Sequence, residues 1–125
     1  MPLRMSIRAV RGAITASENS REAILAATRE LLLALIEANR IDASAVIAAT
    51  FSVTADLDQA YPAEAARNLE WTEAGLLCVQ EMRVQGTLDR CIRVRVLWET
   101  ERPQSAMKHC YLGGASDLRP DLLEG

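Results

Sequence analysis

Hydrophobic and polar residues alternate most regularly between Cys91 and Thr100, and this alternation predicts a β-strand. Apolar side chains occupy every second position on one side of the predicted strand: Ile92, Val94, Val96 and Trp98. The other side mixes apolar and charged residues: Cys91, Arg93, Arg95, Leu97 and Glu99. We therefore expect one face in the core. The other is expected to be a half-buried surface where an arginine is held rigidly and can meet an anion.

Helical spacing predicts two helices that pack on a sheet. The longer helix is capped by Asn19 or Ser20 and ends near Asn39. Glu22 stands three residues after Asn19, which is the spacing of a capping box. The apolar stripe of this helix is wide enough to cover one face of a sheet: Ile24, Leu25, Leu31, Leu32, Leu35 and Ile36. The shorter helix is expected over residues 61–69. A proline near its start is compatible with this helix, because backbone N–H groups of the first turn have no partner within a helix.

Four further strands are expected from short apolar and β-branched runs, at residues 5–11, 46–54, 76–84 and 107–112. Gly12 is expected to end the first strand in a turn, and Asp42 or Ser44 to cap a single helical turn before the second. Gly113 and Gly114 are expected to form a flexible joint after the last strand.

The predicted order is strand, helix, strand, helix, strand, strand, strand. This order indicates an α/β (α+β) fold with a single mixed five-stranded sheet, packed by one long and one short helix. We expect one domain over residues 1–125, of which about 115–125 form a mobile C-terminal segment.

Amino-acid composition limits the kinds of partner that the protein can bind. Hydrophobic residues make up 50% of the 125 residues but aromatic ones only 4%, so the core must be aliphatic, and a small subunit of this kind often adds core by oligomerising. The net charge of −3 gives no broad attraction to nucleic acid or to an anionic membrane. Any anion site must therefore be local, and the arginines matter by position.

Cysteine and histidine usage argues against a metal site. The three cysteines, Cys78, Cys91 and Cys110, have no close paired spacing, and the single histidine, His109, cannot complete a Cys/His cluster. No apolar segment has the length of a signal peptide or of a membrane span. We expect a reduced, cytoplasmic protein.

The residues that can carry chemistry are mainly arginines, because no phosphate-binding loop, nucleotide fingerprint or catalytic triad order is present. A hydroxylated dicarboxylate is the ligand that suits the set of candidates, which are Arg11, Arg67, Arg93, Arg119, Glu81, Cys78 and Tyr111. Structural interpretations compete for each residue. Arg95 and Arg8 are expected to be solvated or paired, and Cys78 alone is usually a small buried hydrophobe.

Several ordered pieces, spread over nearly the whole chain, carry a family resemblance. They are Arg8-Ala9-Val10-Arg11-Gly12-Ala13, Tyr61-Pro62-Ala63, Ala65-Ala66-Arg67, Cys78-Val79-Gln80-Glu81-Met82, Cys91-Ile92-Arg93-Val94, Pro103-Gln104, His109-Cys110-Tyr111-Leu112 and Leu118-Arg119-Pro120-Asp121-Leu122. In these pieces the chain resembles the monofunctional, trimeric chorismate mutases of the pseudo-α/β-barrel class.

The resemblance implies an isomerase that converts chorismate to prephenate, a Claisen [3,3] rearrangement on the shikimate route to phenylalanine and tyrosine. It implies a cytoplasmic homotrimer that needs no cofactor, nucleophile or proton transfer. The partner is the small molecule chorismate, with neither nucleic acid nor membrane. The physical task is to hold a flexible dianion in its compact, chair-like form and to stabilise charge that develops on the ether oxygen.

The resemblance also assigns roles by position. Arg93 is expected to reach the ether oxygen and a neighbouring carboxylate, and Glu81 to accept the hydrogen bond of the ring hydroxyl. The other substrate contacts it implies are Arg11, Tyr111, Cys78, Arg67 and Arg119. The wall of a pocket between adjacent subunits is assigned to Tyr61, Ala63, Leu76 and Leu77, and Leu118 lies in a terminal segment that closes over substrate.

Some positions depart from the family, and two other functions stay open. Glu64 stands where a member of that family has a lysine near the pocket mouth, and the reversed charge should weaken attraction for a dianion unless Glu64 turns away. Leu76-Leu77 replaces a smaller and more polar pair, so the shape of the pocket is expected to differ. A non-catalytic trimer that holds a small carboxylate is one alternative, and an enamine or imine deaminase of similar fold is another. Glu81 together with Arg93 favours the mutase.

Overall fold

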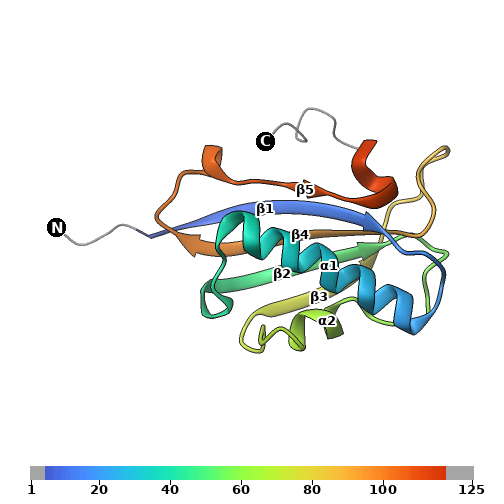
Figure 1. The fold of residues 1–125 in the computed structure, drawn as a ribbon, viewed down its shortest axis with the longest axis horizontal. Helices are drawn as coiled ribbons and strands as arrows, with labels where there is room; N and C mark the ends of the chain where they lie inside the picture. The colour runs from blue at the N-terminus through green and yellow to red at the C-terminus, as the bar shows by residue number, and fades with distance from the viewer. Residues whose placement is uncertain (1–4, 118–125) are drawn as a thin grey trace.

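The computed structural model describes residues 5–117, which form one sheet with two α-helices (Figure 1). The strands are β1 (Ser6–Thr15), β2 (Val46–Val53), β3 (Gly75–Gln80), β4 (Cys91–Thr100) and β5 (Cys110–Tyr111). The helices are α1 (Arg21–Asn39) and α2 (Ala63–Arg67), with 3₁₀ turns η1 (Ala43–Ala45), η2 (Gln104–Ala106) and η3 (Gly113–Asp117). The predicted element order and the mixed five-stranded sheet are confirmed.

The sheet has the strand order β3-β2-β4-β1-β5, so the arginine-bearing strand β4 lies at its centre. β4 pairs antiparallel with β1 on one side and with β2 on the other. The outer pairs, β2 with β3 and β1 with β5, are parallel. A central strand is fixed by hydrogen bonds along both edges, which makes β4 the most constrained position in the sheet for a functional side chain.

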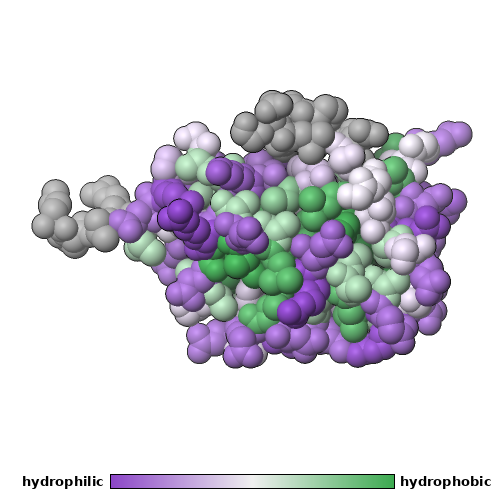
Figure 2. All heavy atoms as spheres, in the orientation of Figure 1, coloured by the Kyte–Doolittle hydropathy of each residue, from purple (hydrophilic) through white to green (hydrophobic). Residues whose placement is uncertain are grey.

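The hydrophobic core lies between the sheet and the helices, and α1 extends across the sheet while α2 lies beside β3 (Figure 1). The helix-facing side of β4 is buried as its alternation predicts, at Ile92, Val94, Val96 and Trp98. From α1 the fully buried apolar residues are Ile24, Leu31, Leu32 and Leu35. On the face that α1 covers, apolar residues gather near the middle and polar residues around the rim (Figure 2).

The opposite side of the sheet, which we name the open face, carries neither α1 nor α2. A small cluster of Ala13, Cys91, Tyr111 and Ala115 buries one end of it. Large apolar side chains elsewhere on this face are exposed: Ile7 (55%), Leu77 (57%) and Val79 (41%). Ile7 lies on β1 and the other two on β3, so exposed apolar side chains occur on both sides of this face, which is consistent with an interaction surface.

The prediction that Gly12 ends the first strand in a turn is wrong, since β1 continues through it to Thr15. Gly12 is buried where α1 and β5 approach β1 closely. A Cβ atom there would lie 2.8 Å from the Cys110 carbonyl oxygen and 2.8 Å from Leu31 Cδ1. The glycine therefore allows close packing of β1 against its neighbours. A glycine required for close packing and a glycine required for a turn look the same in the sequence.

At the ends of α1, one predicted cap is confirmed and the predicted capping box is not. Ser20 is the N-cap and its side chain accepts a hydrogen bond from the Ala23 backbone N–H, so the capping box from Asn19 does not form. The helix ends at Asn39 as predicted, with Arg40 in the left-handed conformation. Asp42 caps the short turn η1, as one of the two expected residues.

Four other predicted elements differ in length or form. α2 ends at Arg67 and β3 ends at Gln80, each earlier than expected, and β5 contains only two residues. The expected flexible joint at 113–114 is instead the start of η3, where Gly113 has a φ of 56° and packs against Thr15. Within residues 5–117 no helix has the length and apolar character that crossing a membrane requires.

Candidate active site

Strand register brings three arginines and two hydroxyl residues together on the open face. Arg93 lies opposite Ser52 of β2, and Arg95 lies opposite both Thr50 of β2 and Arg11 of β1. Residues directly opposite in neighbouring strands point to the same face of a sheet. They line a cavity of about 310 Å³ that we name the arginine cavity, lined by Arg11, Gly12, Thr50, Ser52, Arg93, Val94, Arg95 and Tyr111.

Arg93 and Glu81 form the one ion pair of the described residues at this cavity. Arg93 Nε lies 3.6 Å from Glu81 Oε1, although Glu81 comes just after β3 and not from a neighbouring strand of β4. Ser52 Oγ donates a hydrogen bond of 2.5 Å to the same carboxylate oxygen. Glu81 is thus held by side chains of both β2 and β4.

Arg93 Nε is buried and makes no hydrogen bond within the described part of the chain. A buried donor without an acceptor costs free energy, on the order of 1–3 kcal/mol, so such a group is usually explained by a ligand or by function. The side chain is 36% exposed, which leaves the rest of the guanidinium accessible from the cavity. The geometry suits an anion that approaches Arg93 from the open face.

Small and aromatic residues fix the inner end of the cavity. Tyr111 is 7% exposed and pairs in register with Ala13 of β1, beside Arg93. Burial raises the pKa of the Cys91 thiol above its ordinary value, and the nearby Arg93 guanidinium offsets part of that rise. Cys91 therefore stays a neutral thiol at pH 7 and packs as a small hydrophobe beside the arginine.

A second cavity, of about 600 Å³, lies near α2 and shares no lining residue with the first. We name it the α2-side cavity. Its polar and aromatic lining includes Arg21, Asp58, Tyr61, Glu64 and Cys78. Cys78 pairs in register with Phe51 of the core, so it faces the helices and not the open face where Glu81 lies.

Polar side-chain contacts between distant segments shape the α2-side cavity. Asn19 Nδ2 donates a hydrogen bond to Asp58 Oδ1, and this contact is the main cause that lowers the pKa of Asp58. Arg21 donates two hydrogen bonds to Glu64, one to each carboxylate oxygen. The Arg21 contact likewise holds the pKa of Glu64 below its ordinary value.

The predicted site residues are distributed over these cavities and other parts of the fold. Arg11, Arg93 and Tyr111 line the arginine cavity, and Tyr61 and Cys78 line the α2-side cavity. Glu81 lines another cavity, of about 750 Å³, and is joined to the arginine cavity by its ion pair with Arg93. Arg67 is exposed at the end of α2, Ala63 is buried in the core, and Leu76 is half-buried against it. Leu77 lies on the open face, and Leu118 and Arg119 lie outside the described residues.

Three polar residues of the arginine cavity, Thr50, Ser52 and Arg95, were not among the predicted site residues. Thr50 and Ser52 occupy alternate positions in an otherwise apolar strand, a pattern that could have indicated a functional face. Arg95, which we expected to be solvated or paired, is exposed and lines the cavity beside Arg93. Among residues 5–117, no group of three or more His, Cys, Asp or Glu side chains could hold a metal ion.

Comparison with known proteins identifies the family. The family model described as chorismate mutase type I matches residues 7–122. The chain is 50% identical to chorismate mutase AroH of Thermus thermophilus over 117 residues, which are 93% of this chain and 96% of that protein. It is 41% identical to chorismate mutase AroH of Bacillus subtilis (strain 168) over 119 residues, 94% of each chain.

A solved structure gives the same result for the fold. A chorismate mutase from Clostridium thermocellum superposes with a TM-score of 0.84 and 44% sequence identity, over 86% of this chain and 96% of that one. These matches favour the mutase over the carboxylate-binding and deaminase alternatives. The chain belongs to the type I chorismate mutase family.

Proposed function

We propose that this chorismate mutase converts chorismate to prephenate with Arg93 as the cation that stabilises the transition state. The observation that carries the proposal is the buried Nε of Arg93, which has no hydrogen-bond acceptor in the described chain and lies 3.6 Å from Glu81. The reaction breaks a carbon–oxygen bond and builds negative charge on the ether oxygen. A rigid guanidinium on the central strand is preorganised to meet that charge.

The other residues of the arginine cavity suit the rest of the substrate. Arg11 can pair with a carboxylate at the outer part of the cavity, and Tyr111 offers a phenol at its inner end. Glu81 accepts the ring hydroxyl, while Ser52 keeps its carboxylate in place. Together these contacts hold the dianion in the compact form that reacts, which lowers the entropic part of the barrier.

We propose that the complete site lies between copies of the chain in a homotrimer. The arginine cavity opens on a face that carries the exposed apolar residues Ile7, Leu77 and Val79. Cys78 and Tyr61 line a separate cavity that a single chain cannot bring to Arg93. Contact between the open face of one copy and the α2 side of the next would join the two halves and cover the apolar surface.

Membership of the family supports the remaining assignments, which we include in the proposal. Arg67 is an accessory cation, and Ala63, Leu76 and Leu77 shape the wall. Arg119 as a further accessory cation and Leu118 as a substrate contact belong to the same proposal, and both lie outside the described residues. The chain functions as a single domain, and the enzyme works in the cytoplasm. No cofactor takes part, since the rearrangement moves electrons within one molecule.

Loss of chorismate absorbance in the presence of purified protein tests the proposed activity. We expect turnover without added metal or cofactor, at a rate proportional to protein concentration. Absence of turnover in a folded preparation would reject the enzyme and favour the carboxylate-binding alternative. Identification of prephenate as the product separates the mutase from a deaminase, which would release ammonia from a different substrate.

Light scattering tests the assembly. We expect a particle of three times the 13.7 kDa chain mass at micromolar concentration. A monomer that retains full activity would reject a site shared between copies, without affecting the proposed reaction.

A further inference from the structure

Glu64 poses an electrostatic problem at the α2-side cavity. Its carboxylate lines the cavity that we propose joins the arginine cavity of the next copy, and the substrate carries two negative charges. The Glu64 side chain is 30% exposed, so it is accessible to a bound or approaching anion. An unpaired carboxylate there would repel the dianion.

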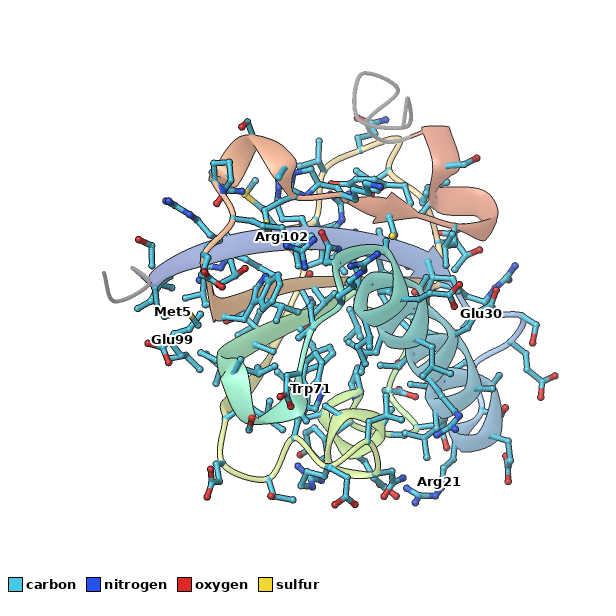
Figure 3. All side chains as sticks on the ribbon, turned by 60° about the vertical axis from the view of Figure 1, so that its left-hand side comes forward. Met5, Arg21, Glu30, Trp71, Glu99 and Arg102 are labelled. Atoms are coloured by element: carbon cyan, nitrogen blue, oxygen red, sulfur yellow. The ribbon has the colours of Figure 1, made fainter. Side chains whose placement is uncertain are left out.

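Arg21 binds this carboxylate with both terminal nitrogens. Arg21 Nη1 donates a hydrogen bond of 2.9 Å to Glu64 Oε1, and Nη2 donates to Oε2. The pair joins the first residue of α1 to the second residue of α2, and Figure 3 shows Arg21 at the end of α1 that lies beside α2. A two-point contact of this kind fixes the direction of the carboxylate as well as its charge.

The other charged groups near the pair do not replace Arg21. No hydrogen bond joins Arg67 to Glu64 among the described residues, so Arg67 attracts the Glu64 carboxylate only through its charge, and less strongly than Arg21 does. Asp58 lines the same cavity and adds negative charge, and its carboxylate accepts hydrogen bonds from Asn19 and Gln59, which are neutral. Glu22, next to Arg21, is also acidic. Arg21 is thus the cation that directly neutralises Glu64.

We propose that Arg21 is a positioning residue for substrate binding, which holds Glu64 in an ion pair and so prevents it from repelling the anionic substrate. This inference rests on the proposed shared site. Arg21 acts through Glu64 and does not touch the reacting atoms, so its contribution appears in KM and not in kcat.

Steady-state kinetics of four variants test the inference. For Arg21→Ala we expect KM for chorismate to rise about tenfold while kcat stays within about twofold of wild type. Glu64→Gln should leave KM at or below the wild-type value. The double variant should return to within about twofold of Glu64→Gln, because the repelling charge is gone. Arg21→Lys should restore most of the loss.

Salt and a matched control separate a charge effect from a structural one. The KM difference between Arg21→Ala and wild type should shrink as ionic strength rises, since exposed charges are screened. Arg29→Ala removes the same charge from the exposed side of α1, outside the cavity lining, and should leave KM within about twofold. If Arg21→Ala does not fold, Arg21→Gln keeps the side-chain stem and serves in its place.

Two results would overturn the inference. One is an unchanged KM in folded Arg21→Ala. The other is a double variant whose KM stays as high as that of Arg21→Ala, which would make Arg21 a direct substrate contact. Both are read in an enzyme that still turns over, whereas a wild-type protein without turnover would reject the proposed function itself.

Discussion

The arginine cavity and the α2-side cavity are built by different means. Arg93 and Arg95 stand on the central strand β4 and Ser52 on the neighbouring strand β2, and both strands are paired along both edges. Arg21 and Glu64 stand at the starts of two helices and are joined only by their side chains. The rigid cavity suits charge stabilisation, which depends on preorganised donors, whereas the second suits the binding of substrate.

The two cavities also differ in charge. The described lining of the arginine cavity contains three cations and no carboxylate, and Glu81 contacts two of its residues, Arg93 and Ser52. The α2-side cavity contains two carboxylates and one cation, Arg21. An anionic substrate is therefore attracted to the open face and needs local compensation on the other side.

The largest effect expected is on the rate when Arg93 is replaced. Arg93→Lys keeps the charge but loses the planar fork and the Nε position, so kcat should fall by at least about 10²-fold. Arg95→Lys, on the same face of the same strand, should lose much less. Steady-state kinetics on both variants measure the difference, and equal losses would mean that the cavity supplies only a general positive field.

A side chain added at Gly12, where β1 packs closely against α1 and β5, should destabilise the fold. A methyl group at Gly12 meets the Cys110 carbonyl oxygen and Leu31, so Gly12→Ala should lower the free energy of unfolding by about 1–3 kcal/mol. In Gly75→Ala the nearest atom is the Ile47 carbonyl oxygen at 3.8 Å, an ordinary contact, and we expect little change. Urea denaturation of both variants checks the contrast, and equal stability of the two would contradict it.

Loss of the hydroxyl that holds Glu81 should have a moderate effect. Ser52→Ala removes the 2.5 Å hydrogen bond to Glu81 and should lower kcat/KM by about tenfold, or about 1.4 kcal/mol. Ser52→Thr retains a hydroxyl and should recover most of the activity. An unchanged kcat/KM in Ser52→Ala would show that Arg93 alone is enough to place Glu81.

The smallest effect expected is on acid stability at the α2-side cavity. Asn19 lowers the folded-state pKa of Asp58, so this contact stabilises the fold above the unfolded pKa and is lost as pH falls through the folded value. Stability of wild type should therefore decline more between about pH 5 and pH 3 than that of Asn19→Ala. Ser17→Ala, an exposed neighbour, should follow wild type. Parallel curves for all three proteins would reject the role of the contact.

Local pattern was enough to predict the elements and one face of the site. Alternation in β4 located Arg93 and the core residues opposite it, because period-two burial is a local property of a strand. The same pattern could not rank Arg93 above Arg95, and only family resemblance did so. Gly12 was misjudged because a turn and a close approach require the same residue type.

Contacts between distant segments could not be read from the chain. Ser52 and Glu81 are 29 residues apart, and Arg21 and Glu64 are 43 residues apart. Their pairing depends on the parallel register of β2 with β3 and on the packing of α2 beside α1. Neither is encoded in local spacing, so a charge reversal at Glu64 was visible in the sequence but its partner was not.

The most direct test of the shared site is recovery of activity in mixed trimers. Arg93→Lys disables the arginine cavity, and Cys78→Trp fills the α2-side cavity with an indole, so each variant alone should be nearly inactive while light scattering still shows a trimer. After joint refolding of equal amounts, about a quarter of the contacts pair two intact halves, and we expect about a quarter of wild-type activity. Activity no greater than the mean of the separate variants would contradict the account, because each chain would then hold its whole site.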